Sequence, residues 1–296
     1  MVNDRMYEAA LDALPDSTAV LDPSATILAV NRAWRMFGLD NGGRPQDTGT
    51  GVNYLDVCAR AAEAGCEDAQ RAAAGLLAVL DGETKHSELE YACPSPAANR
   101  WFLVRMVPLS GGTGGAVISH VNITRRKMAE QALAHEAAHD PLTGLANRSL
   151  FAEQLTAALA RRPDRVTGSQ VGLLFLDVDG FKEINDTYGH EAGDEVLLTL
   201  AHRLRSNVRP QDTVARLGGD EFAVAAPRIA AAALDGLVAR IGAALAEPHL
   251  VHGRLLLVTV SIGVNLATPG DRADTALRRA DQAMYAVKRA ARPLPG

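Results

Sequence analysis

The stretch Arg216-Leu217-Gly218-Gly219-Asp220-Glu221-Phe222 lies between two apolar runs, Val214 to Leu217 and Phe222 to Ala226. Two glycines between β-prone segments predict a tight hairpin, because glycine accepts the positive φ angles that a two-residue turn requires. The next two residues are acidic, although Asp and Glu are poor strand formers. We therefore expect a hairpin that presents the carboxylates of Asp220 and Glu221 close to its tip.

A second acidic cluster lies upstream, at Asp177-Val178-Asp179. It ends the continuous apolar run from Val171 to Leu176, which is typical of a central strand buried on both faces. Carboxylates at two neighbouring strand ends offer the oxygen ligands that Mg²⁺ prefers. The two clusters together predict a metal-dependent enzyme that acts on a nucleotide.

Length and composition narrow the class of protein. A chain of 296 residues with 47% apolar and 22% charged residues suits two domains, each with its own core. The net charge of −5 argues against a nucleic-acid binder, which would show a basic face. Cys58, Cys66 and Cys93 lack metal-type spacing and are expected to be reduced thiols. No signal peptide or membrane-spanning run is visible, so we expect a cytoplasmic protein without membrane contact.

Residues 1–122 alternate short elements in an order that resembles a PAS domain, an α+β sensor module. Val121-Asn122-Ile123-Thr124 also resembles the end of that family's domain. We expect a helix over 6–14, strands over 18–22 and 26–31, a short helical turn over 32–37, a loop over 40–51, helices over 54–64 and 68–80, and strands over 87–93, 101–109 and 115–121.

The input signal of this domain stays open. None of the three cysteines lies in a flavin-photoadduct motif, and no histidine precedes His86, where a haem type commonly uses a helix histidine. His86 itself is expected to be an exposed polar residue. The ligand is therefore unknown, and both a small-molecule pocket and a domain that only dimerises remain as alternatives.

Residues 123–139 form the connector. The segment from Arg125 to His139 contains no Gly or Pro and is rich in Ala, Glu, Gln and Lys, which predicts a helix. Met128, Ala132 and Leu133 give a thin apolar stripe. Both a short parallel coiled coil between two copies and a solvated single helix fit this stripe.

Residues 140–296 open with Asp140-Pro141-Leu142-Thr143-Gly144-Leu145-Ala146-Asn147-Arg148. Together with Asp177, the Asn185-Asp186 and Gly189-His190 pairs, the 218–222 hairpin and Lys288, this opening resembles a GGDEF domain, the diguanylate cyclase module. The resemblance implies a palm-like α/β domain with a mixed, mainly antiparallel sheet. The whole chain is thus expected to be an α+β PAS-GGDEF protein, with domains at 1–122 and 140–296 joined by a signalling helix.

The resemblance also implies a metal site. Asp177, Asp220 and the Val178 carbonyl would hold two Mg²⁺ ions, or Mn²⁺ instead, with Glu221 near the second ion. Paired metals clamp the attacking and leaving oxygens in phosphoryl chemistry. Asp220, Glu221 and Asp177 are accordingly the expected catalytic residues; the alternative is that these acids only cap strands.

The triphosphate of GTP would lie at the start of the helix that follows Asp179. Backbone N–H groups at a helix start form an anion site, here at Gly180, Phe181 and Lys182. Lys182 adds a positive charge. By resemblance, Lys288 and Arg292, one turn apart on the last helix, also reach the phosphates.

Guanine recognition falls to Asn185 and Asp194 by the same resemblance. A carboxylate accepts from the N1–H and exocyclic amine of guanine, and adenine lacks this pair of donors. Asp194 therefore predicts a preference for GTP. A second role, capping the helix that contains Val196 and Leu200, is also expected.

Arg209-Pro210-Gln211-Asp212 matches the family's Arg-x-x-Asp inhibitory site at its usual distance before the hairpin. An arginine and an aspartate can grip one guanylate of the product, whereas a surface ion pair would contribute almost nothing. Arg240, on the next amphipathic helix, is a further candidate contact.

These expectations combine into one hypothesis, a diguanylate cyclase that condenses two GTP molecules into cyclic di-GMP and two pyrophosphates. One GGDEF domain binds one GTP, so catalysis would need a homodimer through the PAS domain and the connector. The alternative is a catalytically silent GGDEF receptor that binds nucleotide as a PAS-regulated signalling module.

Overall fold

The computed structural model describes residues 2–40, 44–95, 98–111, 114–160, 170–268 and 270–291. Contacts divide the chain into two compact units, residues 1–131 and residues 132–296. The division falls inside helix α6 (Thr124–Ala138), the helix predicted for the connector.

The first unit contains a five-stranded antiparallel sheet in the order β2-β1-β5-β4-β3. Its elements follow the predicted chain order of two strands, several helices and three strands. They are α1 (Val2–Asp12), β1 (Ser17–Leu21), β2 (Ile27–Val30), α2 (Arg32–Asp40), α3 (Pro45–Thr48), α4 (Tyr54–Glu63), α5 (Glu67–Leu80), β3 (Ser87–Ser95), β4 (Ala98–Pro108) and β5 (Ala116–Asn122).

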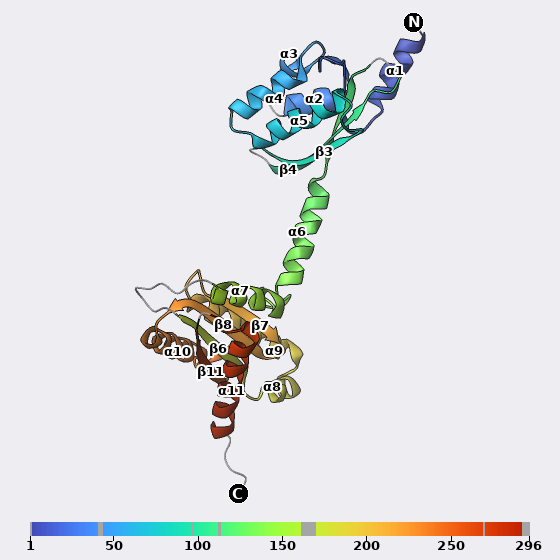
Figure 1. The fold of residues 1–296 in the computed structure, drawn as a ribbon. Coiled ribbons are helices and arrows are strands. Elements are labelled where there is room, and N and C mark those ends of the chain that lie inside the picture. The colour runs from blue at the N-terminus through green and yellow to red at the C-terminus, as the bar shows by residue number, and fades with distance from the viewer. Residues whose placement is uncertain are drawn as a thin grey trace. The chain divides into compact units, whose positions relative to one another are not determined.

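The core of this unit lies between the sheet and its helices (Figure 1). Leu21 and Ile118 from the sheet and Leu76 from α5 are almost fully buried there. The segment predicted to be a loop over 40–51 contains the single turn α3. Pro45 lies at the start of this turn. Backbone N–H groups at the start of a helix have no partner within the helix, so proline, which has no N–H, fits there.

The second unit is built on a four-stranded sheet in the order β11-β6-β8-β7. The strands are β6 (Gln170–Val178), β7 (Thr213–Gly218), β8 (Glu221–Ile229) and β11 (Val260–Ala267). All pairings between these strands are antiparallel, and the parallel component is an isolated bridge between Ala146 and Ala215.

The apolar residues from Leu255 to Val260 predict a single strand, and this prediction is wrong. The chain ends β10 (Arg254–Leu256) and starts β11 at Val260, with no strand between. Among the described strands, β10 pairs only with β9 (His249–Val251), so these residues form a separate two-stranded hairpin.

Helices cover both faces of the four-stranded sheet (Figure 1). Leu174 and Leu176 of β6 pack with α9 and α10, whereas Leu173 and Phe175 pack with α7 and α11. Successive side chains of a strand point to opposite faces of the sheet. Because helices cover both faces, successive positions of β6 from Val171 to Leu176 are apolar, which gives the continuous apolar run in the sequence. The helices are α7 (Arg148–Ala160), α8 (Phe181–Tyr188), α9 (His190–Ser206), α10 (Ala231–Leu245) and α11 (Ala273–Ala291).

In the part of the chain that the structure describes, no helix combines the length and apolar character needed to traverse a bilayer.

Candidate active site

The two acidic clusters meet at one edge of the second sheet. Asp177, at the end of β6, pairs in register with Glu221, the first residue of β8. The backbone N–H of Val178 donates to the carbonyl of Asp220 at 3.3 Å. The strand ends that the sequence identified separately are therefore neighbours.

The hairpin turns one residue later than its glycines suggest. Gly218 pairs with Glu221, so the two residues of the loop are Gly219 and Asp220. Gly219 adopts a φ of 53°, which glycine accepts without strain. Asp220 consequently lies at the tip itself.

The carboxylates of Asp220 and Asp177 are close enough to interact electrostatically. Desolvation, followed by the negative charge of Asp177, raises the pKa of Asp220. Lys288 of α11 donates a hydrogen bond to Asp177 Oδ1, so a cation already lies against this carboxylate. Burial lowers the pKa of Lys288 and the hydrogen bond to Asp177 raises it, and the net result is a raised pKa.

Glu221 has a partner that sequence reasoning missed. Arg148, the first residue of α7, donates to Glu221 Oε2 at 3.2 Å and to the carbonyl of Leu217 at 3.1 Å. Desolvation raises the pKa of Glu221, and the charge of Arg148 opposes that rise. One arginine thus links the Glu221 carboxylate to the backbone of the hairpin.

A second arginine fixes the hairpin to the opening motif of the domain. Arg216 donates from Nε to the carbonyl of Gly219 at 2.9 Å and forms an ion pair with Asp140 at 3.1 Å. Both side chains of the pair are largely buried. Asp140 also accepts hydrogen bonds from the backbone and hydroxyl of Thr143. Arg148 and Arg216 therefore both bond backbone carbonyls of the hairpin.

The site offers two aspartates and a nearby glutamate, all with oxygen donors. Among the described residues, no group of three or more His, Cys, Asp or Glu side chains lies close enough together to hold a metal alone. Mg²⁺ commonly binds through one or two carboxylates and takes its other ligands from water and substrate phosphates. The donor set of Asp177 and Asp220 fits that mode of binding.

The predicted phosphate site begins at Gly180, which caps α8 in the left-handed conformation with φ 69° and has no capping side chain. Lys182, in the first turn of α8, is exposed. Lys288 lies at Asp177, as described above. Arg292, its predicted companion, lies outside the described residues.

The predicted guanine contacts lie where α8 meets α9. The side chain of Asn185 lies against Gly193, where an added Cβ would be 2.0 Å from Asn185 Oδ1. Gly193 thus admits Asn185 next to Asp194, and sequence reasoning had missed it. The capping role expected for Asp194 was wrong, because α9 starts at His190 with Gly189 as its cap. Asp194 is exposed on the first turns of α9.

The Arg209–Asp212 motif forms a turn in which Asp212 accepts from the backbone N–H of Arg209 at 2.9 Å. Arg240 of α10 reaches the same region, since its Nε donates to the carbonyl of Asn207 at 3.1 Å. A cavity of about 410 Å³ is lined by Arg209, Asp212 and His139, among others. The three predicted residues are therefore near one another along the chain's surface.

Comparison with known families decides what this unit is. Residues 137–293 match the family described as "Diguanylate cyclase, GGDEF domain", which covers more than half of the chain. The chain belongs to the GGDEF diguanylate cyclase family. Residues 11–128 match the PAS fold, as the order of elements in the first unit predicted.

Two relatives illustrate the likeness of the GGDEF part. Diguanylate cyclase TpbB of Pseudomonas aeruginosa is 44% identical over 168 residues, which are 54% of this chain and 37% of TpbB. Response regulator PleD of Caulobacter vibrioides is 44% identical over 160 residues, which are 53% of this chain and 35% of PleD. The chain thus spans little more than a third of the length of these relatives.

Solved structures agree on the fold of the GGDEF unit. The coiled coil and GGDEF domain of DgcB from Caulobacter crescentus, in complex with c-di-GMP, matches with a TM-score of 0.53 and 32% identity, covering 57% of this chain and 90% of that chain. SiaD from Pseudomonas aeruginosa, in complex with its activator SiaC, matches with a TM-score of 0.50 and 34% identity, covering 57% of this chain and 64% of that chain.

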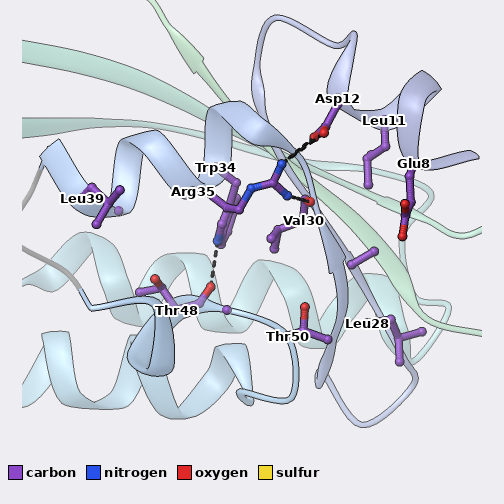
Figure 2. Close-up of a pocket in the computed structure, with 13 residues that line it drawn as sticks. Glu8, Leu11, Asp12, Leu28, Val30, Trp34, Arg35, Leu39, Thr48 and Thr50 are labelled. Atoms are coloured by element: carbon purple, nitrogen blue, oxygen red, sulfur yellow. Dashed lines mark hydrogen bonds and ion pairs between the residues drawn. The ribbon is translucent and has the colours of Figure 1, made fainter. Parts of the chain in front are cut away.

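The PAS unit contains a cavity of about 750 Å³ bounded by α1, β2, α2 and the segment after α3. Figure 2 shows Arg35 within it, bonded to Asp12 at 2.9 Å and to the carbonyl of Val30 at 2.8 Å. The indole Nε1 of Trp34 donates to the carbonyl of Thr48 at 2.8 Å. The Arg35 guanidinium and the Trp34 indole therefore already have partners within the domain.

The PAS core also contains a histidine that sequence reasoning overlooked. His120 of β5 lies 2.7 Å from the Tyr91 hydroxyl through Nδ1 and 3.4 Å from the Tyr54 hydroxyl through Nε2. The rings of Trp34 and Phe37 lie alongside, with centroids 5.3 and 6.1 Å away. Burial lowers the pKa of His120 to about 4, so the imidazole is neutral near pH 7.

Proposed function

We propose that this chain condenses two GTP molecules into cyclic di-GMP and releases two pyrophosphates. The 3′-oxygen of each GTP attacks the α-phosphorus of the other, and the bond between the α-phosphorus and the oxygen bridging to the β-phosphate breaks. The observation that carries this proposal is the convergence of Asp177 and Asp220 at adjacent strand ends, beside Lys288. Membership of the GGDEF family supports it.

Asp177, the Val178 carbonyl, Asp220 and Glu221 would hold two Mg²⁺ ions, or Mn²⁺. The unfavourable interaction of Asp177 with Asp220 favours cations here, because a bound cation relieves the repulsion between carboxylates. Bound Mg²⁺ would supply Lewis-acid stabilisation of the α-phosphate and lower the pKa of the attacking hydroxyl.

The other residues of the proposed site bind and orient GTP. Asn185 and Asp194 select guanine, because a carboxylate accepts from the two donors that adenine lacks. The N–H groups at Gly180 and Phe181, with Lys182, bind the triphosphate. Lys288 and Arg292 add positive charge there, and Lys288 also neutralises Asp177.

Glu221 is the candidate acceptor of the proton from the 3′-hydroxyl. Its carboxylate lies at the start of β8, next to Asp177, and Arg148 orients it. The proton moves to a Glu221 oxygen as the bond between the 3′-oxygen and phosphorus forms.

Catalysis requires two copies of the GGDEF domain, because each holds one GTP and the two nucleotides attack each other. We assign the pairing to the PAS domain and α6. No residue of α6 is buried within one copy, and Met128 and Leu133 are 64% and 66% exposed. Pairing of two α6 helices would cover Met128. The PAS domain would then regulate turnover by changing this pairing.

The decisive experiment incubates the purified chain with GTP and Mg²⁺ and resolves the products by chromatography. Cyclic di-GMP with pyrophosphate is expected, and Asp220→Asn should remove both while circular dichroism stays unchanged. Nucleotide binding without turnover in a confirmed dimer would instead support the silent GGDEF receptor. Equal turnover by Asp220→Asn would contradict the metal assignment.

Feedback by the product is proposed at Arg209, Asp212 and Arg240. Arg209→Ala should raise the concentration of cyclic di-GMP that halves the rate by more than tenfold, since a bidentate, charge-assisted contact of about 1.5–3 kcal/mol is lost. Initial rates at increasing added product measure this. Arg254→Ala, an exposed arginine of β10, is the matched control and should leave inhibition unchanged. Inhibition that is equally strong in Arg209→Ala would exclude this site.

A further inference from the structure

Two histidines lie at the end of α6, outside the catalytic machinery. His135 lies in the last turn of α6, and His139 directly follows the last residue of the helix. The backbone N–H of His139 still donates to the carbonyl of His135 at 2.9 Å, so the two side chains share one face. Their rings are stacked, with centroids 3.9 Å apart and planes inclined by 20°. A histidine pair with this spacing on a helix is a recurrent way to bind zinc.

The hydrogen bonding of His139 leaves it in the form that a metal requires. His139 Nδ1 lies 2.9 Å from the carbonyl oxygen of His135, which can only accept, so the proton is on Nδ1. Nε2 then carries a free lone pair, and within the described ranges no group donates to it. A hydrogen bond from the second ring nitrogen to a carbonyl is the usual support for a metal-binding histidine.

The pair is also held rigidly on the GGDEF unit. Asn147 donates from Nδ2 to the carbonyl of Ala137 at 2.6 Å and from its backbone N–H to that of Ala138 at 2.9 Å. His139 forms an isolated β-bridge with Ala146. Ligands fixed in this way lose little conformational freedom on binding a metal.

One copy supplies only half of a zinc site. Zinc in structural sites takes four ligands, and the described residues contain no third metal-ligating side chain in reach of this pair. The segment His135-Glu136-Ala137-Ala138-His139 also has the spacing of a hydrolytic zinc motif, but such a site needs a third protein ligand. A second copy of the chain is the remaining source of ligands.

The spacing along α6 points to that second copy. Met128, Ala132, His135 and His139 are separated by four, three and four residues, which is the spacing of the contact positions in a coiled coil. In a parallel pair of helices, these positions of one copy meet the same positions of the other. Both histidine pairs would then lie at the seam.

We propose that His135 and His139 of two copies form a four-imidazole site for Zn²⁺ that clamps the paired α6 helices. The pairing of α6 is part of the proposed function, and the zinc site deepens it. Neutral imidazoles select Zn²⁺ over Mg²⁺, which prefers oxygen ligands. The bound ion would stabilise the dimer that brings two GGDEF domains together.

The test titrates Zn²⁺ into the full chain, purified without a polyhistidine tag and kept in excess Mg²⁺, by calorimetry and by sedimentation velocity. We expect one Zn²⁺ per two chains and a larger dimer fraction. His135→Ala and His139→Ala should each weaken binding more than about tenfold, the least that loss of even an outer-shell partner costs. His202→Ala, an exposed histidine of α9, and Asp220→Asn are the controls and should bind as the wild type does.

Co²⁺ provides a spectroscopic readout, because a tetrahedral four-nitrogen site gives intense visible absorption bands. These bands should appear in the wild type and be absent from both histidine variants. One Zn²⁺ per chain without dimerisation, or unchanged binding in both variants, would overturn the proposal. None of these measurements depends on cyclase turnover, so failure of the zinc site and failure of the proposed function are separate results.

Discussion

His120 makes the stability of the PAS unit depend on pH. Its pKa in the folded state is about 4, against an ordinary value of 6.5, because burial disfavours the charged imidazole. The unfolded chain therefore takes up a proton that the folded chain excludes. This contribution to the free energy of unfolding of the PAS unit is fully present above pH 6.5. It is lost as the pH falls toward 4, and the loss amounts to up to about 3 kcal/mol.

Both tryptophans, Trp34 and Trp101, lie in the PAS unit, so their fluorescence reports the unfolding of that unit alone. Urea titrations at pH 7.5 and pH 5 should show the loss of stability in the wild type. His120→Asn removes the titrating group and should reduce the difference between the two pH values. The same difference in the variant would assign the effect to other groups.

The sequence predicted the acidic residues of the site because their positions follow from local patterns. Asp177 ends an apolar run, and Asp220 follows two glycines. Arg148 escaped prediction as the partner of Glu221, since 73 residues separate them and only the packed fold joins α7 to the hairpin. His120 was missed for the same reason, because its partner Tyr91 is 29 residues away on another strand.

At the scale of elements, the contact of β11 with α11 determines where Lys288 lies. A Cβ added to Gly263 of β11 would be 2.1 Å from the Met284 nitrogen and 2.2 Å from the Ala280 oxygen, both backbone atoms of α11. Gly263→Ala must therefore push α11 away from the sheet. We expect a loss of about 1–3 kcal/mol of stability, the usual cost of overpacking, together with loss of turnover.

Chemical denaturation of the whole chain, followed by far-ultraviolet circular dichroism, measures this loss. Gly236→Ala in α10 is the matched control, because a Cβ there meets no atom within 4 Å and alanine favours a helix. The control should be as stable as the wild type or slightly more stable. Equal stability of Gly263→Ala would mean that α11 yields without cost.

Strands with a clear hydrophobic pattern were predicted correctly. The segment in which the chain passes from one sheet to another was not. β6 and the hairpin of β7 and β8 were confirmed within a few residues. The apolar run from Leu255 suggested one strand into Val260, yet Leu255 and Leu257 are 74% and 76% exposed. No local pattern shows that the chain leaves one sheet after Leu256 and enters another at Val260.

For the whole molecule, the proposed chemistry requires that two chains meet. A GGDEF unit holding one GTP has no second nucleotide to attack, so a single chain should be inactive. Turnover per chain should then follow the fraction of dimer. The connector α6 is the element whose pairing sets that fraction, because its exposed Met128 lies at a predicted contact position.

Dilution tests this requirement. Initial rates of cyclic di-GMP formation at saturating GTP should be constant per chain at high protein concentration and should fall in proportion to concentration once dimers dissociate. Sedimentation velocity over the same range identifies where dissociation occurs. Met128→Cys, oxidised so that a disulfide links two copies of α6, should keep its turnover on dilution and lose that protection when reduced. Constant turnover per chain, at concentrations where only monomer sediments, would show that one chain suffices and would refute pairing as the basis of catalysis.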